Sequence, residues 1–160
     1  MNTIPFAMLI SGGGTTATAI WNAKRQGLLP KIDFQLVIAS QPDAKGIGRL
    51  VEAGFSRRDI AVLARNEFHS CETFGRAIKG SFRDRGITHF GQYGWLPYTP
   101  ENVCANFFGI NQHPGPIDPA RGNEYGFGGR GMHGRAVHAA VLAYAKTVNR
   151  LWTEAIAHRV

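Results

Sequence analysis

Short apolar runs alternate with amphipathic helical segments along nearly the whole chain, and this order restricts the fold more than any other feature of the sequence. The runs are rich in β-branched residues, as strands are, whereas the segments between them repeat with the spacing of a helix. Because right-handed crossovers place helices on both sides of a parallel sheet, the order predicts an α/β fold with a mainly parallel sheet and helices on both faces. The expected strands are residues 5–10, 34–40, 60–63, 88–93, 107–111 and 155–160, and the expected helices are 15–26, 47–53, 72–85 and 133–148.

Size and charge limit the domain organisation and the partners. The 160 residues are 44% hydrophobic, which is enough for one sizeable core, and we expect no second independent core. An excess of 18 Lys and Arg over 11 Asp and Glu gives a net charge of +7, which attracts phosphorylated or carboxylated partners. The basic residues are scattered without a dense run, so they favour a small anionic ligand over nucleic acid.

The cysteines, the histidines and the apolar stretches predict a cytoplasmic protein without a metal. Cys71 and Cys104 cannot build a disulfide framework, and the sequence contains no CxxC pair. His133 and His138 are five residues apart and miss the i, i+4 spacing of a metal-binding helix face, so we expect no zinc site with His113. No stretch has the length of a membrane span or of a signal peptide, and we expect no membrane partner.

A glycine-rich loop follows the first expected strand and leads into the first helix. Main-chain N–H groups and the positive end of the helix converge on such a loop and can bind a phosphate. The pattern from Gly12 to Ala17 also matches the dinucleotide-binding fingerprint, but the second strand ends without the acidic residue that this fingerprint needs. A third interpretation is that the glycines only form a tight turn. The candidate phosphate-binding residues are Gly12, Gly13, Gly14, Thr15 and Thr16.

An Asn-x-His pair ends the fifth expected strand. Residues two apart in a strand point to the same side, so Asn111 and His113 can share one pocket. An amide is a neutral hydrogen-bond donor and an imidazole is an acid or base near neutral pH. Together they can polarise a carbonyl and stabilise the oxyanion that forms when an amine attacks it. The alternative is that Asn111 caps the following loop and His113 is a hydrogen-bonded core residue.

Four stretches together resemble a known family. Their order and spacing are similar to those of the phosphoribosylglycinamide formyltransferases, which move a formyl group from 10-formyltetrahydrofolate to an amine. The resemblance covers nearly the whole chain and implies the Rossmann-like formyltransferase fold of that family. The stretches are Leu9 to Thr16, Ser40 to Gly46 with Glu52 to Gly54, Gly91 to Pro97, and Ile110 to Pro116.

The resemblance also implies roles for the motif residues. The glycine loop would bind the phosphate of the substrate, and Asn111 and His113 would be the catalytic amide and the catalytic acid. The formyl donor would be 10-formyltetrahydrofolate, and no metal is implied. The folate-binding residues implied in this way are Trp95, Leu96, Pro97, Tyr98 and Asn111.

The sequence departs from the family at several positions. Thr16 stands where the family loop has asparagine, Cys71 replaces an arginine that helps to bind folate, and residues 115–131 form a longer link than the family has. The family's third catalytic group, an aspartate after the sixth strand, has no counterpart, and the nearest acid is Glu154. We therefore expect residues 1–160 to form a single formyltransferase-like α/β domain that lacks the family's C-terminal elements and has little transformylase activity.

The expected function is that of a cytoplasmic formyltransferase of purine biosynthesis. It would transfer a formyl group from the folate to a primary amine, that of glycinamide ribonucleotide. Three alternatives stay open: another amine acceptor, such as an amino-sugar nucleotide or methionyl-tRNA; a ligand-binding relative without catalysis; and a dinucleotide-dependent oxidoreductase. The expected partners are the phosphorylated amine and the folate, and a homodimer is compatible with the sequence.

Overall fold

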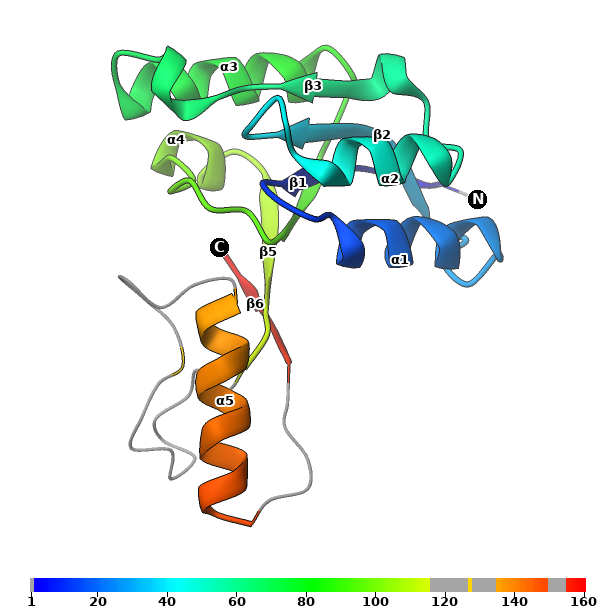
Figure 1. The fold of residues 1–160 in the computed structure, drawn as a ribbon. Helices are drawn as coiled ribbons and strands as arrows, with labels where there is room; N and C mark the ends of the chain where they lie inside the picture. Colours follow the sequence, from blue (N-terminus) through cyan, green and yellow to red (C-terminus); the bar gives the residue numbers. More distant parts are fainter. Residues whose placement is uncertain (1, 116–126, 128–134, 150–154) are drawn as a thin grey trace. The chain divides into compact units, whose positions relative to one another are not determined.

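The computed structural model of the chain describes residues 2–115, 127, 135–149 and 155–160 (Figure 1). These residues belong to two compact units. The first is formed by Met1–Ile110 with Arg159–Val160, and the second by Asn111–His158. Helices α1 to α4 lie in the first unit, and helix α5 lies in the second.

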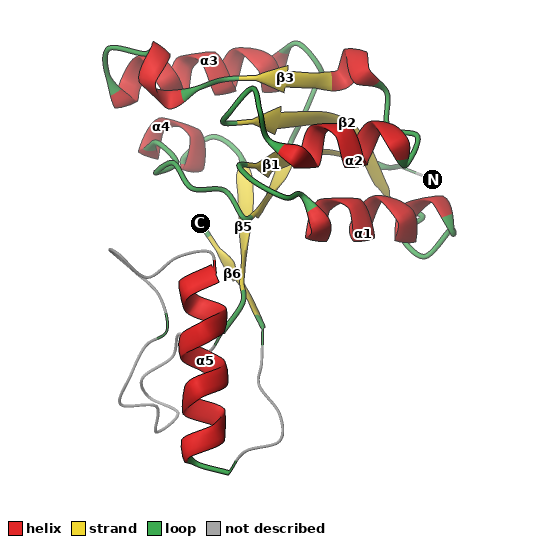
Figure 2. Cartoon of the chain, viewed as in Figure 1, coloured by secondary structure: helices red, strands yellow, loops and turns green. Residues whose placement is uncertain are grey.

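A six-stranded sheet with the strand order β3-β2-β1-β4-β5-β6 organises the chain (Figure 2). Strand β1 pairs in parallel with both β2 and β4, and β2 pairs in parallel with β3. The predicted α/β fold with a mainly parallel sheet is therefore confirmed. The strand order reverses between β1 and β4, and ligands of such sheets bind beyond the carboxyl ends of the strands at this point. The strands are β1 Ile4–Ile10, β2 Ile32–Ala39, β3 Ile60–Val62, β4 His89–Tyr93, β5 Phe108–His113 and β6 Ile156–Arg159, and the helices are α1 Thr15–Arg25, α2 Lys45–Glu52, α3 Cys71–Arg83, α4 Glu101–Cys104 and α5 Arg135–Thr147.

Alternate side chains of β1 enter two separate cores in the first unit, one on each face of the sheet. Met8 and Ile10 pack into a core with buried residues of α1 and α2. Ala7 and Leu9 pack into the other core with the buried residues of α3. The three helices lie on opposite sides of the strands in Figure 1. Helices therefore cover both faces of this part of the sheet, as the alternation of strands and helices predicted.

Strand β2 contains an extra residue that shifts the alternation of its side chains between the two cores. The register with β1 shifts by one residue at this point, and Gln35 is left without a partner in the neighbouring strand. The side-chain amide of Gln35 donates a hydrogen bond to Asp33 Oδ2 in the same strand, at 2.7 Å. Because of the insertion, Phe34 and Val37 enter the same core although they are three residues apart.

The expected helices are present, with small shifts at their ends that have local causes. Helix α3 begins at Cys71 because Ser70 caps it. The Ser70 hydroxyl accepts a hydrogen bond from the Thr73 N–H, and the Thr73 hydroxyl accepts one from the Ser70 N–H. The sequence analysis did not predict α4, since its four residues are too few to show a helical period. Burial of Val103 holds this short helix against the sheet.

The second unit is built around α5. Val137 and Val141 of this helix are buried together with Phe127. Gly115 also packs here, because a Cβ on it would lie only 2.8 Å from Val141 Cγ2. No helix that the structure describes, in either unit, has the length and the apolar character needed to span a bilayer.

Candidate functional site

The glycine loop between β1 and α1 packs against the start of α2. Gly14 has a left-handed backbone with φ of 63°. A Cβ on Gly14 would lie 2.5 Å from the Cα of Gly46, so the two loops approach as closely as glycine allows. The Gly46 N–H also donates to the carbonyl of Gly12 at 2.9 Å. The tight turn considered for the glycines is thus the structural reason for Gly14.

The carbonyl groups and the N–H groups of this loop are used differently. The carbonyls of residues 12–14 accept hydrogen bonds from Gly46, Arg49 and Thr18 at 2.8–2.9 Å. Within the described part of the chain, the N–H groups of residues 12–16 make no hydrogen bond, and no side chain caps the start of α1. Open N–H groups at the positive end of an 11-residue helix are suited to bind an anion.

The predicted phosphate-binding residues lie together on this loop. Gly12, Gly13 and Thr15 are exposed, Thr16 is half-buried, and Gly14 is buried. A Cβ on Gly12 would meet no atom within 4 Å, so the space beside this residue is open. Packing therefore explains Gly14, whereas Gly12 leaves room for a ligand to approach the main chain.

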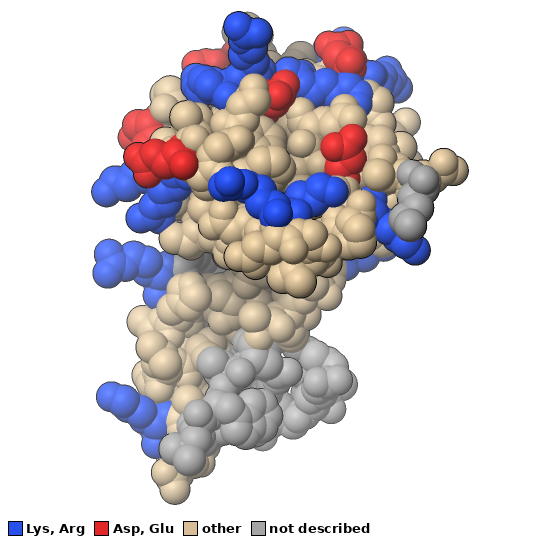
Figure 3. All heavy atoms as spheres, turned by 90° about the vertical axis from the view of Figure 1, so that its right-hand side faces the viewer, with Lys and Arg blue, Asp and Glu red and all other residues tan. Residues whose placement is uncertain are grey.

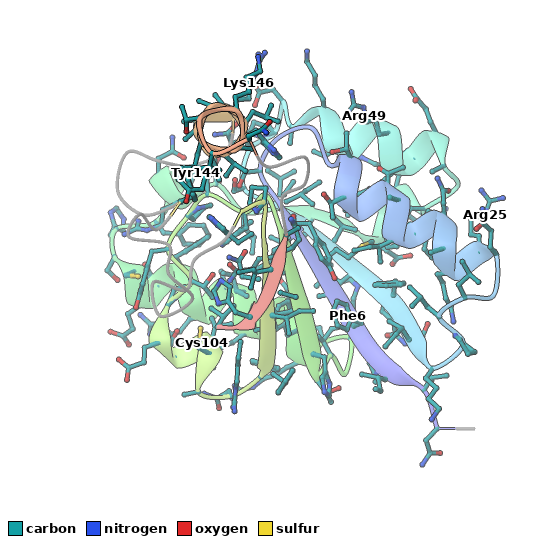
Figure 4. All side chains as sticks on the ribbon, turned by 90° about the horizontal axis from the view of Figure 1, so that it is seen from below. Phe6, Arg25, Arg49, Cys104, Tyr144 and Lys146 are labelled. Carbon is teal, nitrogen blue, oxygen red and sulfur yellow. The ribbon has the colours of Figure 1, made fainter. Side chains whose placement is uncertain are left out.

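Arg49 of α2 is a site residue that the sequence analysis did not single out. Its Nη1 donates to the Gly13 carbonyl at 2.8 Å, which holds the guanidinium beside the loop. Figure 4 shows Arg49 near the start of α1, whereas Arg25 lies at the other end of this helix. No carboxylate among the described residues forms an ion pair with Arg49. The signal in the sequence was a basic residue one turn after Gly46, but the contact itself depends on the packing of α2 against the loop.

Figure 3 shows the distribution of charge over one face of the described residues. On the face drawn in Figure 3, Lys and Arg alternate with Asp and Glu instead of forming one continuous patch.

The predicted folate-binding segment, residues 95–98, has a buried start and an exposed middle. Trp95 is buried and stacks on Phe74 of α3, with ring centroids 6.2 Å apart and an angle of 5° between the rings. Leu96 and Tyr98 are 53% and 77% exposed. The indole ring of Trp95 therefore belongs to the core, and the surface open to a ligand is formed by Leu96 to Tyr98.

Buried polar residues flank this segment on both sides: Gln92 and Tyr93 precede it, and Thr99 follows it. Gln92 Nε2 donates to Thr99 Oγ1 at 2.6 Å, and both side chains are buried. Burial raises the pKa of Tyr93, the last residue of β4, to about 12. The Tyr93 ring folds back over Gly91, where a Cβ would lie 2.3 Å from its hydroxyl oxygen. Gly91 thus makes room for a phenol that stays protonated at neutral pH.

The predicted catalytic pair lies on β5 in the second unit. Asn111 and His113 are both half-buried. The Asn111 amide is 3.0 Å from His158 Nε2, and His113 Nε2 is hydrogen-bonded to the Phe127 carbonyl. The structure agrees with the alternative of a hydrogen-bonded histidine, because Nε2 of His113 makes this bond. The other ring nitrogen of His113, Nδ1, takes no part in it.

The hydrogen-bond partners determine where protons lie. A carbonyl only accepts, so His113 must carry a proton on Nε2. An amide NH₂ only donates, so the Asn111 amide donates and His158 accepts through Nε2. The second N–H of the Asn111 amide is not needed for the bond to His158 and can be donated to a substrate carbonyl.

His158 of β6 is the second site residue that the sequence analysis did not single out. It lies 47 residues from Asn111 along the chain, and only the pairing of strands brings the two side chains together. Glu154 and His133, which were considered as the nearest acid and as a metal ligand, lie outside the described residues. Among the residues that are described, no group of three or more His, Cys, Asp and Glu could hold a metal ion.

Comparison with solved structures shows which known proteins share the fold. No family model matches the sequence, and no curated protein is similar to it in sequence. Glycinamide ribonucleotide transformylase 1 from Symbiobacterium toebii matches 99% of this chain with a TM-score of 0.76 and 22% identity, and the match covers 66% of that protein. Glycinamide ribonucleotide transformylase 1 from Geobacillus kaustophilus matches 98% of this chain with a TM-score of 0.75 and 21% identity, over 74% of its own length.

A third match is phosphoribosylglycinamide formyltransferase from Coxiella burnetii, with a TM-score of 0.70 and 23% identity over 99% of this chain. The chain spans 66% of this protein, as it does of the Symbiobacterium protein. These similarities extend over nearly all of the chain. The chain therefore has the α/β fold of the phosphoribosylglycinamide formyltransferases.

Proposed function

We propose that this protein is a folate-dependent formyltransferase. It transfers the formyl group of 10-formyltetrahydrofolate to the primary amine of a phosphorylated acceptor, and the acceptor proposed is glycinamide ribonucleotide. One observation carries the proposal: in a chain with the formyltransferase fold, the loop after β1 has open N–H groups, and β5 bears the amide and imidazole that acyl transfer needs.

The acceptor is held through its phosphate. The N–H groups of residues 12–16 donate to the phosphate oxygens, and the positive end of α1 favours the negative charge. Arg49 keeps one N–H on the Gly13 carbonyl and has further N–H groups that can be donated to the anion. A neutral amine without a phosphate gains none of these contacts, so the loop selects phosphorylated acceptors.

The formyl donor is held by the segment from Leu96 to Tyr98. Its main chain offers hydrogen-bonding groups to the polar edge of the pterin, and its exposed apolar side chains can cover the ring. Trp95 does not contact the donor in this proposal, because its ring is buried on Phe74. Its contribution is to anchor the start of the segment in the core.

Asn111 and His113 carry out the chemistry. The amine nitrogen of the acceptor forms a bond to the formyl carbon, and the electron pair of the carbonyl double bond moves onto the oxygen. The free N–H of Asn111 stabilises this oxyanion, while His158 keeps the amide oriented. When the oxyanion collapses, the bond from the formyl carbon to the folate nitrogen breaks, the amine loses a proton and the folate nitrogen gains one.

His113 supplies the proton in its charged form. Because Nε2–H is donated to the Phe127 carbonyl, Nδ1 gives its proton to the folate nitrogen and then takes up the proton that the amine loses. The Phe127 carbonyl then fixes the ring orientation and also stabilises the imidazolium before the transfer. The net result is one N–C bond formed, one N–C bond broken, and one proton moved from amine nitrogen to folate nitrogen.

Kinetics of three variants on β5 test this proposal, each measured against the formyl transfer of the parent, which we expect to be low. Asn111→Ala and His113→Ala are expected to lower kcat for formyl transfer by about a hundredfold or more and to leave KM within a few-fold, because both groups act in the transition state. Gln112→Ala is the matched control, since Gln112 lies between them, is equally half-buried, and points to the other side of the strand. Formyl transfer that is unaffected by His113→Ala would place the chemistry elsewhere.

The identity of the acceptor needs a second measurement with the same assay. Glycinamide ribonucleotide, an amino-sugar nucleotide and methionyl-tRNA are each supplied as the acceptor at equal concentration. We expect the highest kcat/KM with the ribonucleotide. A preference for either of the other amines would keep the formyltransferase and correct the acceptor.

A further inference from the structure

A buried hydroxyl joins the carboxyl ends of three strands in the first unit. Ser11 follows β1 directly, and only 1% of its surface is exposed. Its Oγ accepts a hydrogen bond from the Ser40 hydroxyl at 2.6 Å and one from the Leu96 main-chain N–H at 2.8 Å. Ser40 follows β2, and Leu96 lies three residues after the end of β4. One side chain therefore links the start of the glycine loop to the start of the segment that the proposed function gives to the folate.

The contact with Leu96 holds a stretch of main chain that lies between two buried anchors, the ring of Trp95 and the bond between Gln92 and Thr99. Gly94, two residues before Leu96, has a left-handed backbone with φ of 72°, which turns the chain out of β4. Beyond Leu96 the side chain of Tyr98 is exposed, and the next anchor is the buried bond between Gln92 and Thr99. The Leu96 N–H is thus the hydrogen bond that places the exposed middle of the segment.

We propose that Ser11 is a positioning residue for the formyl donor. It does not touch the donor. Its hydroxyl oxygen fixes the main chain at Leu96, and with it the hydrogen-bonding groups of Leu96 to Tyr98 that the pterin meets. This inference rests on the proposed function, because it assumes that the segment binds a folate.

The serine at this position has no explanation in packing alone. The preceding residues of β1, Met8 to Ile10, are fully buried and apolar, and alanine would fill nearly the same volume as Ser11. The pair of hydroxyls is also not needed to bring β1 and β2 together, since the Ser40 N–H already donates to the Ile10 carbonyl at 2.9 Å. The hydrogen bond from the Leu96 N–H, by contrast, requires an acceptor in the side chain at position 11.

Two variants separate positioning from a general structural role. Ser11→Ala removes the acceptor of the Leu96 N–H, whereas Ser40→Ala removes a neighbouring buried hydroxyl and leaves the Leu96 contact in place. The affinities for 5-formyltetrahydrofolate and for inorganic phosphate are measured by calorimetry with each protein. Amide hydrogen exchange at Leu96 is measured in the same samples.

The expected result is selective. Ser11→Ala weakens binding of 5-formyltetrahydrofolate by roughly tenfold, as for loss of one buried hydrogen-bond partner, and speeds amide exchange at Leu96. Phosphate affinity stays within about twofold, because the N–H groups of the glycine loop do not depend on this hydroxyl. Ser40→Ala leaves the folate affinity and the exchange rate within about twofold of the parent.

Other results overturn the inference. An unchanged exchange rate at Leu96 in Ser11→Ala would show that the hydroxyl does not position the segment. Equal losses of folate and phosphate affinity in both serine variants would show that the pair only supports the fold. If the parent protein binds no 5-formyltetrahydrofolate, the proposed function fails, while the exchange rate at Leu96 still decides whether Ser11 positions this main chain.

Discussion

The two compact units differ in how their side chains are held in place. In the first unit, buried side chains form a core on each face of the sheet, the loop after β1 packs on Gly46, and Trp95 anchors the segment after β4 in one of the cores. In the described part of the second unit, the buried cluster consists of Phe127, Val137 and Val141. The proposed ligand-binding segments belong to the first unit, and the proposed chemical groups belong to the second. The binding segments therefore depend on packing, whereas Asn111 and His113 depend on a few hydrogen bonds.

The largest effect on stability should come from the core of the first unit. Phe74→Ala removes a fully buried ring that stacks on Trp95, and the expected loss in free energy of unfolding is about 3–5 kcal/mol. Val141→Ala in the second unit should cost only about 1–2 kcal/mol, because a smaller side chain leaves a smaller cluster. Urea unfolding measures both, with Leu142→Ala as the exposed control. A loss for Val141→Ala as large as that for Phe74→Ala would contradict the difference between the two units.

The next largest effect is expected within the glycine loop, and it separates packing from binding. Gly14→Ala forces a side chain into a left-handed backbone and onto Gly46, which should cost about 2–3 kcal/mol of stability. Gly12→Ala meets no atom, so stability should stay within about 0.5 kcal/mol, while the new methyl group hinders an anion at the loop. Phosphate titration and urea unfolding of the same variants are the measurements. Gly12→Ala with full phosphate affinity would argue against an anion site at this position.

A pH-dependent effect of intermediate size is expected at the end of β4. The pKa of Tyr93 is about 12 in the folded protein and ordinarily 10.0. Between these values the unfolded chain releases the phenol proton and the folded chain keeps it, so the stability due to this group is full below pH 10 and is lost as the pH rises. The loss approaches about 1.4 kcal/mol per pH unit in this window.

Two substitutions check this pH dependence by urea unfolding at pH 9 and pH 11. Tyr93→Phe should remove part of the alkaline loss of stability, because it has no proton to release. Tyr98→Phe, at an exposed position, should keep the behaviour of the parent. If both variants lose as much stability as the parent, the Tyr93 phenol is not protected by burial.

The smallest effect is expected for Arg49. Arg49→Gln removes the charge and shortens the side chain, so that the contact with the Gly13 carbonyl is lost as well; it should weaken phosphate binding by only a few-fold, as for an exposed ion pair. Arg25→Gln, at the other end of α1, is the matched control and should not change phosphate affinity (Figure 4). The difference between the two variants should shrink in high salt. Equal effects of both would indicate a general influence of net charge.

Several features of the fold and the site follow from local patterns in the sequence. The apolar runs and helical periods predicted the strands and the main helices, because these patterns repeat within ten residues or so. The glycine loop and the Asn-x-His pair could be found in the same way, since each lies in one short segment. The start of α3 was missed by one residue because the cap at Ser70 depends on a hydroxyl rather than on apolar periodicity.

The sequence by itself determined which elements form and where short motifs lie, because periodicity, glycine and buried strands act over neighbouring residues. Only the tertiary structure decided which of these motifs contact one another. Arg49 reaches Gly13 across 36 positions, Asn111 reaches His158 across 47, and Leu96 reaches Ser11 across 85. Such contacts depend on strand order and on the close packing of helix starts, and no local pattern encodes them.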